Sequence, residues 1–208
     1  MTRIEGVDPK QAGPMVKLAL RFGPRLVRKL AGRAPQLDDG LEPLRIQAYQ
    51  PKLMLASARF GAAMQKPRSL DERVHLLAHL KGAQMVGCEY CVDLGSQISR
   101  KSGLSDDELL ALVDYNNSPL FSAAEKAALD FTTGFMRTPV DISDEVFANA
   151  QRYFSNAELV ELAALLAFVN GFRFNAAFEI GSAGFSEGMV CALPDKPAGS
   201  AARLKAAG

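Results

Sequence analysis

The 208-residue sequence has no tryptophan, only three cysteines and two histidines, and almost no net charge. Lys and Arg together number 24 against 23 Asp and Glu, so the chain lacks the positive field that drives nucleic-acid binding. Three cysteines are too few for the disulfide framework of a small secreted domain. The chain is 48% hydrophobic and long enough to fold around a core of its own.

Long hydrophobic runs are also absent. The longest apolar stretch, Leu162 to Val169, is far shorter than the roughly 20 residues that a membrane span needs. The beginning of the sequence, MTRIEGVDPK, is polar and contains no hydrophobic segment of the kind found in signal peptides. We therefore expect a soluble, cytoplasmic protein with no membrane span and no nucleic-acid partner.

The charges are unevenly distributed along the chain. Residues 1–35 contain eight Lys and Arg but only two acidic residues, whereas the remainder contains 16 basic and 21 acidic residues. Gly23-Pro24 interrupts an amphipathic helical pattern in this basic arm. We predict that residues 1–35 form short helices that pack on the body or on another subunit rather than on anionic lipid. The small, polar residues 194–208 are expected to form a flexible tail.

Helix-start signals recur through the body of the chain, where an apolar pattern of helical spacing follows each Ser-x-x-Glu motif. The predicted capping boxes are Ser69/Glu72, Ser105/Glu108, Ser122/Glu125 and Ser155/Glu158. No segment shows the sustained alternation of apolar and polar residues that is typical of strands. The sequence therefore predicts an all-α domain over residues 36–193.

Two segments of this domain match each other at a spacing of 86 residues. The match aligns Glu72 with Glu158 and Gly95-Ser96 with Gly181-Ser182. It predicts an internal helix-turn-helix repeat, of which the first copy carries Cys88-Glu89-Tyr90-Cys91.

The Cys-x-x-Cys motif is the main candidate for chemistry. Gly87 permits a sharp turn that places Cys88 and Cys91 in the first turn of a helix, where the unpaired N–H groups favour thiolate over thiol. Two intervening residues also allow the sulfurs to form a disulfide, which is typical of a redox dithiol. Half of a zinc site is an alternative, but a second Cys-x-x-Cys motif is missing, so no metal is predicted. Two inert, buried cysteines remain the other alternative.

A thiol peroxidase or disulfide reductase needs an acid-base group near the thiols. His79 is the first candidate, because it lies on the helix that leads into the Cys turn. It is alternatively a histidine on a half-buried face with no chemical role. Asp93 is a weaker candidate, since a carboxylate there can simply stabilise the start of the helix. We expect His75 to be more exposed and incidental, and Cys191 to be structural.

The segment from Arg73 to Ser96, with Gly-Cys-Glu-Tyr-Cys after its helix, resembles the core of the alkylhydroperoxidase D-like, carboxymuconolactone decarboxylase-like superfamily. The segment from Glu158 to Asn175 is similar to the second repeat of that superfamily. The resemblance implies an orthogonal helical bundle that assembles into homo-oligomers, often trimers or multiples of them. No cofactor is predicted. The resemblance also implies that Cys91 attacks a peroxide and that Cys88 closes the disulfide. The helix dipole alone favours Cys88 as the attacking thiol.

Two positions depart from the pattern of the family. Its proton-relay glutamate aligns with Leu76, and its histidine four residues after the second cysteine aligns with Gly95. We therefore interpret His79, close to Leu76 on the same helix, as a replacement relay.

The leading hypothesis is a dithiol oxidoreductase that reduces a hydroperoxide or a partner disulfide and is recycled by a dithiol or protein reductant. The alternative is a non-catalytic helical binding or assembly protein that has kept the fold and lost the relay. A lactone-type decarboxylase is a more distant alternative, because that branch typically works without the cysteine pair.

Overall fold

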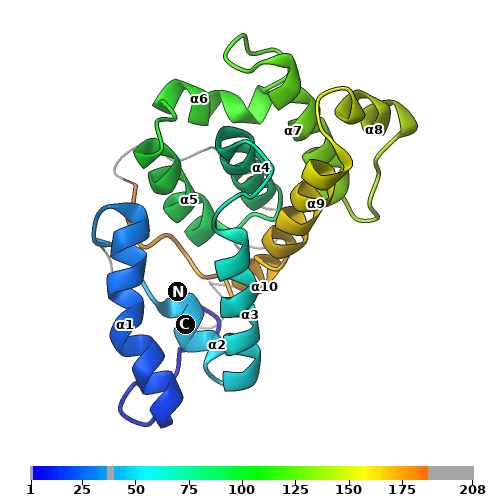
Figure 1. Ribbon diagram of the computed structural model, residues 1–208. Coiled ribbons are helices and arrows are strands. Elements are labelled where there is room, and N and C mark those ends of the chain that lie inside the picture. The colour runs from blue at the N-terminus through cyan, green and yellow to red at the C-terminus, as the bar shows by residue number, and fades with distance from the viewer. Residues whose placement is uncertain (1, 37–39, 187–208) are drawn as a thin grey trace, which may run out of the picture.

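Helix α4 lies at the centre of an all-helical fold, and α5, α7 and α9 pack around it. Figure 1 shows this arrangement in the computed structural model, which describes residues 2–36 and 40–186. No strand occurs in these two ranges, and the predicted all-α fold is confirmed. The helices are α1 (Pro14–Ala31), α2 (Glu42–Gln47), α3 (Pro51–Met64), α4 (Glu72–Met85), α5 (Glu89–Lys101), α6 (Asp106–Ala111), the 3-10 helix η1 (Leu112–Asp114), α7 (Ala123–Met136), α8 (Asp144–Gln151), α9 (Asn156–Asn170) and α10 (Arg173–Ala177).

Helix α4 is central because it is apolar on more than one side. Leu77 and Leu80 belong to one hydrophobic cluster, which contains Cys88 and Cys91. Ala78 belongs to a second cluster, built with α7 and α9. A helix that is apolar on two faces is stable only when neighbours cover both of them.

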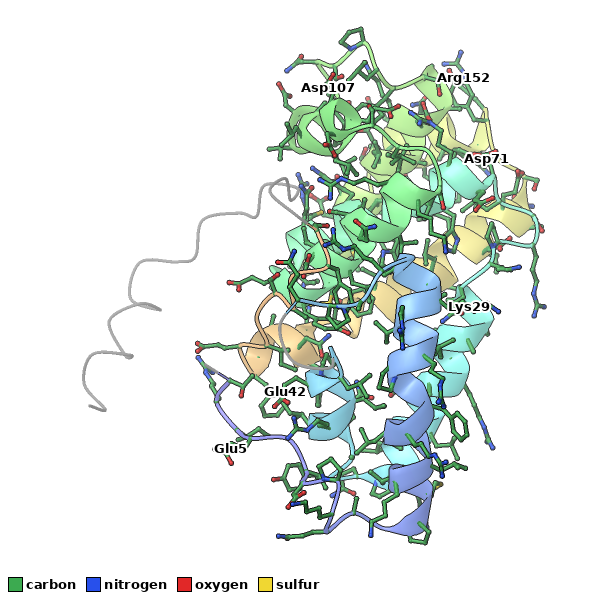
Figure 2. All side chains as sticks on the ribbon, turned by 90° about the vertical axis from the view of Figure 1, so that its left-hand side faces the viewer. Glu5, Lys29, Glu42, Asp71, Asp107 and Arg152 are labelled. Atoms are coloured by element: carbon green, nitrogen blue, oxygen red, sulfur yellow. A yellow bond between two sulfur atoms is a disulfide. The ribbon has the colours of Figure 1, made fainter. Side chains whose placement is uncertain are left out.

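The N-terminal helices α1, α2 and α3 extend from this body, as Figure 1 shows. In Figure 2, the labelled residues Glu5 and Glu42 lie with them, whereas Asp107 and Arg152 lie at the opposite end of the molecule. Residues of α1, α2 and the segment before α1 form a third hydrophobic cluster with Met54 of α3.

Helix α1 contradicts the prediction that the basic arm forms short helices. It runs unbroken through Pro24, although proline cannot donate the backbone hydrogen bond that a helix interior uses. Val16 and Leu20 before the proline are buried, and Val27 after it packs against the same cluster. This packing on both sides of Pro24 holds the two halves in one helix.

Three of the four predicted capping boxes are confirmed, at the starts of α6, α7 and α9. The predicted box Ser69/Glu72 is wrong, because Asp71 caps α4 and accepts hydrogen bonds from Arg73 and Val74. The backbone N–H groups of residues 68–70 instead donate to the carboxylate of Glu161 on α9, at 2.6 to 3.0 Å. Helix α4 therefore begins after Asp71, two residues later than Ser69 would place it.

The corrected cap also changes the register of the internal repeat. Glu72 and Asn156, which begin α4 and α9, are 84 residues apart, and so are Glu89 and Arg173, which begin α5 and α10. The predicted spacing of 86 residues is thus wrong by two. At a spacing of 84, the position that corresponds to Cys91 is Asn175.

Candidate active site

The two thiol positions lie where α5 begins. Gly87 has a φ of 68°, which a glycine adopts without strain, and it turns the chain from α4 into α5. Cys88 is the N-cap of α5, and its Sγ accepts a hydrogen bond from the N–H of Cys91 at 3.2 Å. The two residues form a disulfide, with their Cα atoms 5.2 Å apart. The structure therefore shows the Cys-x-x-Cys motif in its oxidised, disulfide form.

The two sulfurs differ in their surroundings. Cys88 is completely buried, whereas Cys91 retains 5% exposure and lines a cavity of about 270 Å³. Helices α1, α3, α4, α5, α9 and α10 all contribute to its wall, which is mostly apolar. Its apolar side chains include Leu30, Met64, Leu76, Ile98, Phe168 and Phe172. Of the two cysteines, only Cys91 lines the cavity.

Asn175 of α10 brings a polar group to the disulfide. Its Nδ2 lies 3.3 Å from the Sγ of Cys91 and 3.7 Å from that of Cys88. The residue is 8% exposed, and its Oδ1 has no hydrogen-bond partner. An amide donor directed at a sulfur stabilises its thiolate form. In the sequence, Asn175 ends the run that resembles the second family repeat. The predicted spacing of 86 residues aligns Asn175 with Glu89 rather than with Cys91.

His79 lines the same cavity as Cys91. Its ring contacts Phe172 edge to face at 5.4 Å, and a Cβ on Gly95 would lie 3.7 Å from its Nδ1. The pKa of His79 is lowered to about 4, mainly by burial and in smaller part by the neighbouring His75. His79 is therefore neutral at pH 7. It lies directly beside Gly95, the position at which the family resemblance implies a histidine.

His75 is not exposed, contrary to the sequence prediction. It is 6% exposed, it lines the cavity, and its Nδ1 has no hydrogen-bond partner. It precedes His79 by one helical turn, so both rings point to the same side of α4. Burial is also the main cause that lowers the pKa of His75.

Asp93 has a structural role and is not one of the acid-base groups of the site. Its side chain is fully buried. Its Oδ2 accepts hydrogen bonds from Ser182 Oγ and from the backbone N–H groups of Ala183 and Phe185, at 2.7 to 3.0 Å. Its Oδ1 accepts one from the N–H of Ser186 at 2.6 Å. Asp93 thus fastens the segment after α10 to the helix that carries the thiols.

The remaining candidates lie elsewhere or outside the described part of the chain. Glu158 completes the capping box of α9, as predicted, whereas Glu72 caps nothing. Cys191 lies outside the described residues. Within residues 2–36 and 40–186, no group of three or more His, Cys, Asp and Glu side chains is placed to hold a metal ion. In the same ranges, no helix is both long enough and apolar enough to cross a membrane.

Comparison with known proteins finds similar sequences and a shared fold. Residues 51–134 match the model of the Carboxymuconolactone decarboxylase family. The chain is 34% identical to the uncharacterized protein YnjA of Escherichia coli over 159 residues, which cover 75% of this chain and 84% of YnjA.

Two solved structures share the fold. One is a variant of the debrominase Bmp8 in complex with 2,3,4-tribromopyrrole, with a TM-score of 0.69, 20% identity, and coverage of 86% of this chain and 90% of Bmp8. The other, described as an alkylhydroperoxidase AhpD core, is a peroxidase-related protein of Ralstonia eutropha. It has a TM-score of 0.68, 17% identity, and coverage of 87% and 92%.

Proposed function

Because the chain belongs to the carboxymuconolactone decarboxylase family and has the alkylhydroperoxidase D-like fold, we propose that it is a dithiol oxidoreductase that reduces a hydroperoxide. Cys91 is the attacking thiol and Cys88 the resolving thiol. The observation that carries this proposal is the contrast between the two sulfurs, since Cys91 faces the cavity and Cys88 is buried behind it within disulfide distance. Exposure to the cavity thus favours Cys91, although the helix dipole favours Cys88.

The reaction divides into two steps. The Cys91 thiolate attacks the terminal oxygen of the hydroperoxide, the O–O bond breaks, and the alcohol leaves after taking up one proton, so that Cys91 becomes a sulfenic acid. The Cys88 sulfur then attacks the Cys91 sulfur, and the disulfide forms as water departs. A dithiol or protein reductant returns the two electrons and two protons and restores both thiols.

Two neighbours support the first step. The Asn175 amide stabilises the thiolate of Cys91 by a hydrogen bond, as the start of helix α5 also does. His79 moves the proton from the thiol towards the departing alcohol. With a pKa of about 4, its imidazole holds that proton only briefly. Most of the stabilisation of the thiolate therefore comes from Asn175 and the helix.

The test compares the three cysteines one at a time. The reduced, full-length protein is mixed with one equivalent of cumene hydroperoxide, and peroxide loss and the mass of the peptide with Cys88 and Cys91 are followed. Wild type and Cys191→Ser should consume peroxide and lose two hydrogens from that peptide. Cys88→Ser should accumulate a sulfenic acid on Cys91 that dimedone traps, and Cys91→Ser should not consume peroxide.

A dithiol that resists peroxide in the folded wild-type protein would contradict the proposal. That result would favour the alternative of a non-catalytic helical binding or assembly protein. The homo-oligomer, the cytoplasmic location and the reductant remain predictions from the family resemblance and the sequence. Light scattering of the purified protein tests the first of them.

A further inference from the structure

Most of the unpartnered buried polar side-chain atoms of the described residues border a single cavity. His75 Nδ1, Ser99 Oγ and Asn175 Oδ1 have no hydrogen-bond partner, and each of these residues lines the cavity beside Cys91. The fourth such atom in these ranges, Arg45 Nε, belongs to a residue outside the lining. His75 is 6% exposed and Ser99 only 1% exposed. Because buried polar atoms are nearly always hydrogen-bonded, this grouping points to a ligand.

Two of these atoms lie far from the disulfide. Ser99 follows Cys91 by eight residues on α5, which places it about 12 Å along the helix axis. Helices α4 and α5 run in opposite directions as a hairpin, in which His79 packs beside Gly95. One helical turn further from the Cys turn, α4 carries His75 and α5 carries Ser99. The cavity therefore has a dithiol end and a separate polar end.

Apart from His79, the wall between the two ends is apolar. Leu76 of α4, Leu94 and Ile98 of α5 and Phe168 of α9 line it. An elongated apolar group fits this wall, whereas a small polar molecule such as hydrogen peroxide would leave it empty.

The polar end selects for a neutral group. The pKa of His75 is lowered by burial, against smaller opposing contributions from Glu161, the Met64 backbone and Glu72. A neutral imidazole offers one donor and one acceptor nitrogen, and a serine hydroxyl both donates and accepts. A hydroxyl group also donates and accepts, so it can pair with both side chains. A carboxylate would meet no positive charge here and would face the negative charges of Glu161 and Glu72. An ammonium group would lose its hydration in a mostly apolar cavity, at a large cost in free energy.

We infer that His75 and Ser99 form a subsite that binds the hydroxyl group, alcoholic or phenolic, at the far end of an elongated apolar substrate whose reacting group lies at Cys91. Only the statement about the reacting group rests on the proposed function. The hydroxyl subsite exists whether or not the dithiol turns over.

Binding to the oxidised full-length protein tests the subsite without any turnover. The probes are 4-butylphenol and 4-butyltoluene, which differ only in a hydroxyl in place of a methyl group. Wild type should bind the phenol roughly tenfold more tightly than the hydrocarbon, because the phenol pairs two buried groups that otherwise stay unpaired. Ser99→Ala and His75→Leu should each lose most of this preference, whereas Ser102→Ala, at the exposed C-cap of α5, should keep it.

A measurement on wild type covers the case in which a variant does not fold. The chain has only two histidines, so a long-range ¹H–¹⁵N spectrum contains just the rings of His75 and His79. The phenol should shift the Nδ1 resonance of His75 and the hydrocarbon should not. Equal affinity for the two probes, or an unchanged Nδ1 resonance, would overturn the subsite.

The outcomes separate this inference from the proposed function. A phenol preference in a protein that consumes no peroxide sustains the subsite and overturns only the peroxidase. Peroxide consumption without a phenol preference overturns only the subsite.

Discussion

The side-chain amide of Asn175 donates to the Sγ of Cys91 at 3.3 Å, although the two residues are 84 positions apart in the chain. That separation equals the spacing between the starts of α4 and α9 and of α5 and α10. Asn175 therefore stands at the position of the second helix pair that corresponds to Cys91 in the first. One copy of the repeat supplies the sulfur and the other supplies the group that hydrogen-bonds it.

Replacing Asn175 should raise the pKa of the Cys91 thiol. Asn175→Leu removes a hydrogen bond to the thiolate, and a hydrogen bond to a charged group is worth about one to two pKa units. The measurement is the pH dependence of iodoacetamide alkylation in a background in which Cys88 and Cys191 are serine. Asn156→Leu, on the exposed start of α9, should leave the profile unchanged and serves as the control.

Replacing His79 should slow peroxide consumption without stopping it. His79→Phe keeps a ring against Phe172 but removes the proton carrier, so we expect kcat/KM to fall by roughly tenfold. The loss is small for an acid-base group because an imidazole with a pKa of about 4 is a poor base at pH 7. A rate equal to that of wild type would exclude His79 from the proton path.

His79 should also make folding stability depend on pH. The imidazole has a usual pKa of 6.5 when unfolded and of about 4 when folded, so below pH 6.5 the unfolded chain binds a proton that the folded chain does not. The neutral imidazole of His79 makes its full contribution to the unfolding free energy above about pH 6.5. This contribution is lost as the pH falls towards 4. Between pH 7 and pH 5, wild type should lose about 1–2 kcal/mol more unfolding free energy than His79→Phe. Urea unfolding at both pH values measures this difference.

The revised start of α4 can be tested with two alanine variants. Asp71→Ala removes the cap and should lower the unfolding free energy by about 1 kcal/mol. Ser69→Ala should change it by less than about 0.5 kcal/mol, because the Ser69 side chain does not cap the helix. The opposite order of effects would restore the capping box predicted from the sequence.

The buried carboxylate of Asp93 should be important for stability. Asp93→Asn replaces one acceptor oxygen with an NH₂ group that faces backbone donors, so we expect a loss of about 3 kcal/mol. Asp107→Asn, on the exposed first turn of α6, should cost less than about 0.5 kcal/mol. Urea unfolding curves of the two variants make the comparison.

Local signals in the sequence predicted the helices well but the site only in part. A serine and a glutamate three residues later can cap a helix within one turn, and the motifs at Ser105, Ser122 and Ser155 do so. The same spacing at Ser69 fails, because Asp71 caps α4 instead. Pro24 predicts a break that α1 does not have, because the packing that holds this helix together comes from residues distant in sequence. The intrinsic helix propensity of a residue decides little where tertiary contacts oppose it.

The thiol pair was recognisable because both residues lie in one turn of the chain. The position of Asn175 beside Cys91 was not, because it depends on how α10 meets α5. The position of Ser99 in the same cavity depends on how α5 packs against α4. His75 was expected to be exposed for the same reason, since its burial depends on helices outside α4.

The residues that line the cavity come partly from inside and partly from outside the segment that matches the family model. Cys91 and both histidines lie within residues 51–134, the part that matches the family model, whereas Leu30, Phe168 and Asn175 come from segments on either side of it. Substitutions at Leu30 or Phe168 would alter the shape of the cavity while the hairpin that carries the thiols stays the same. Asn175 differs from these two residues, because it also donates a hydrogen bond to the Sγ of Cys91. The surroundings of this sulfur are thus set partly by a segment outside the part that matches the family model.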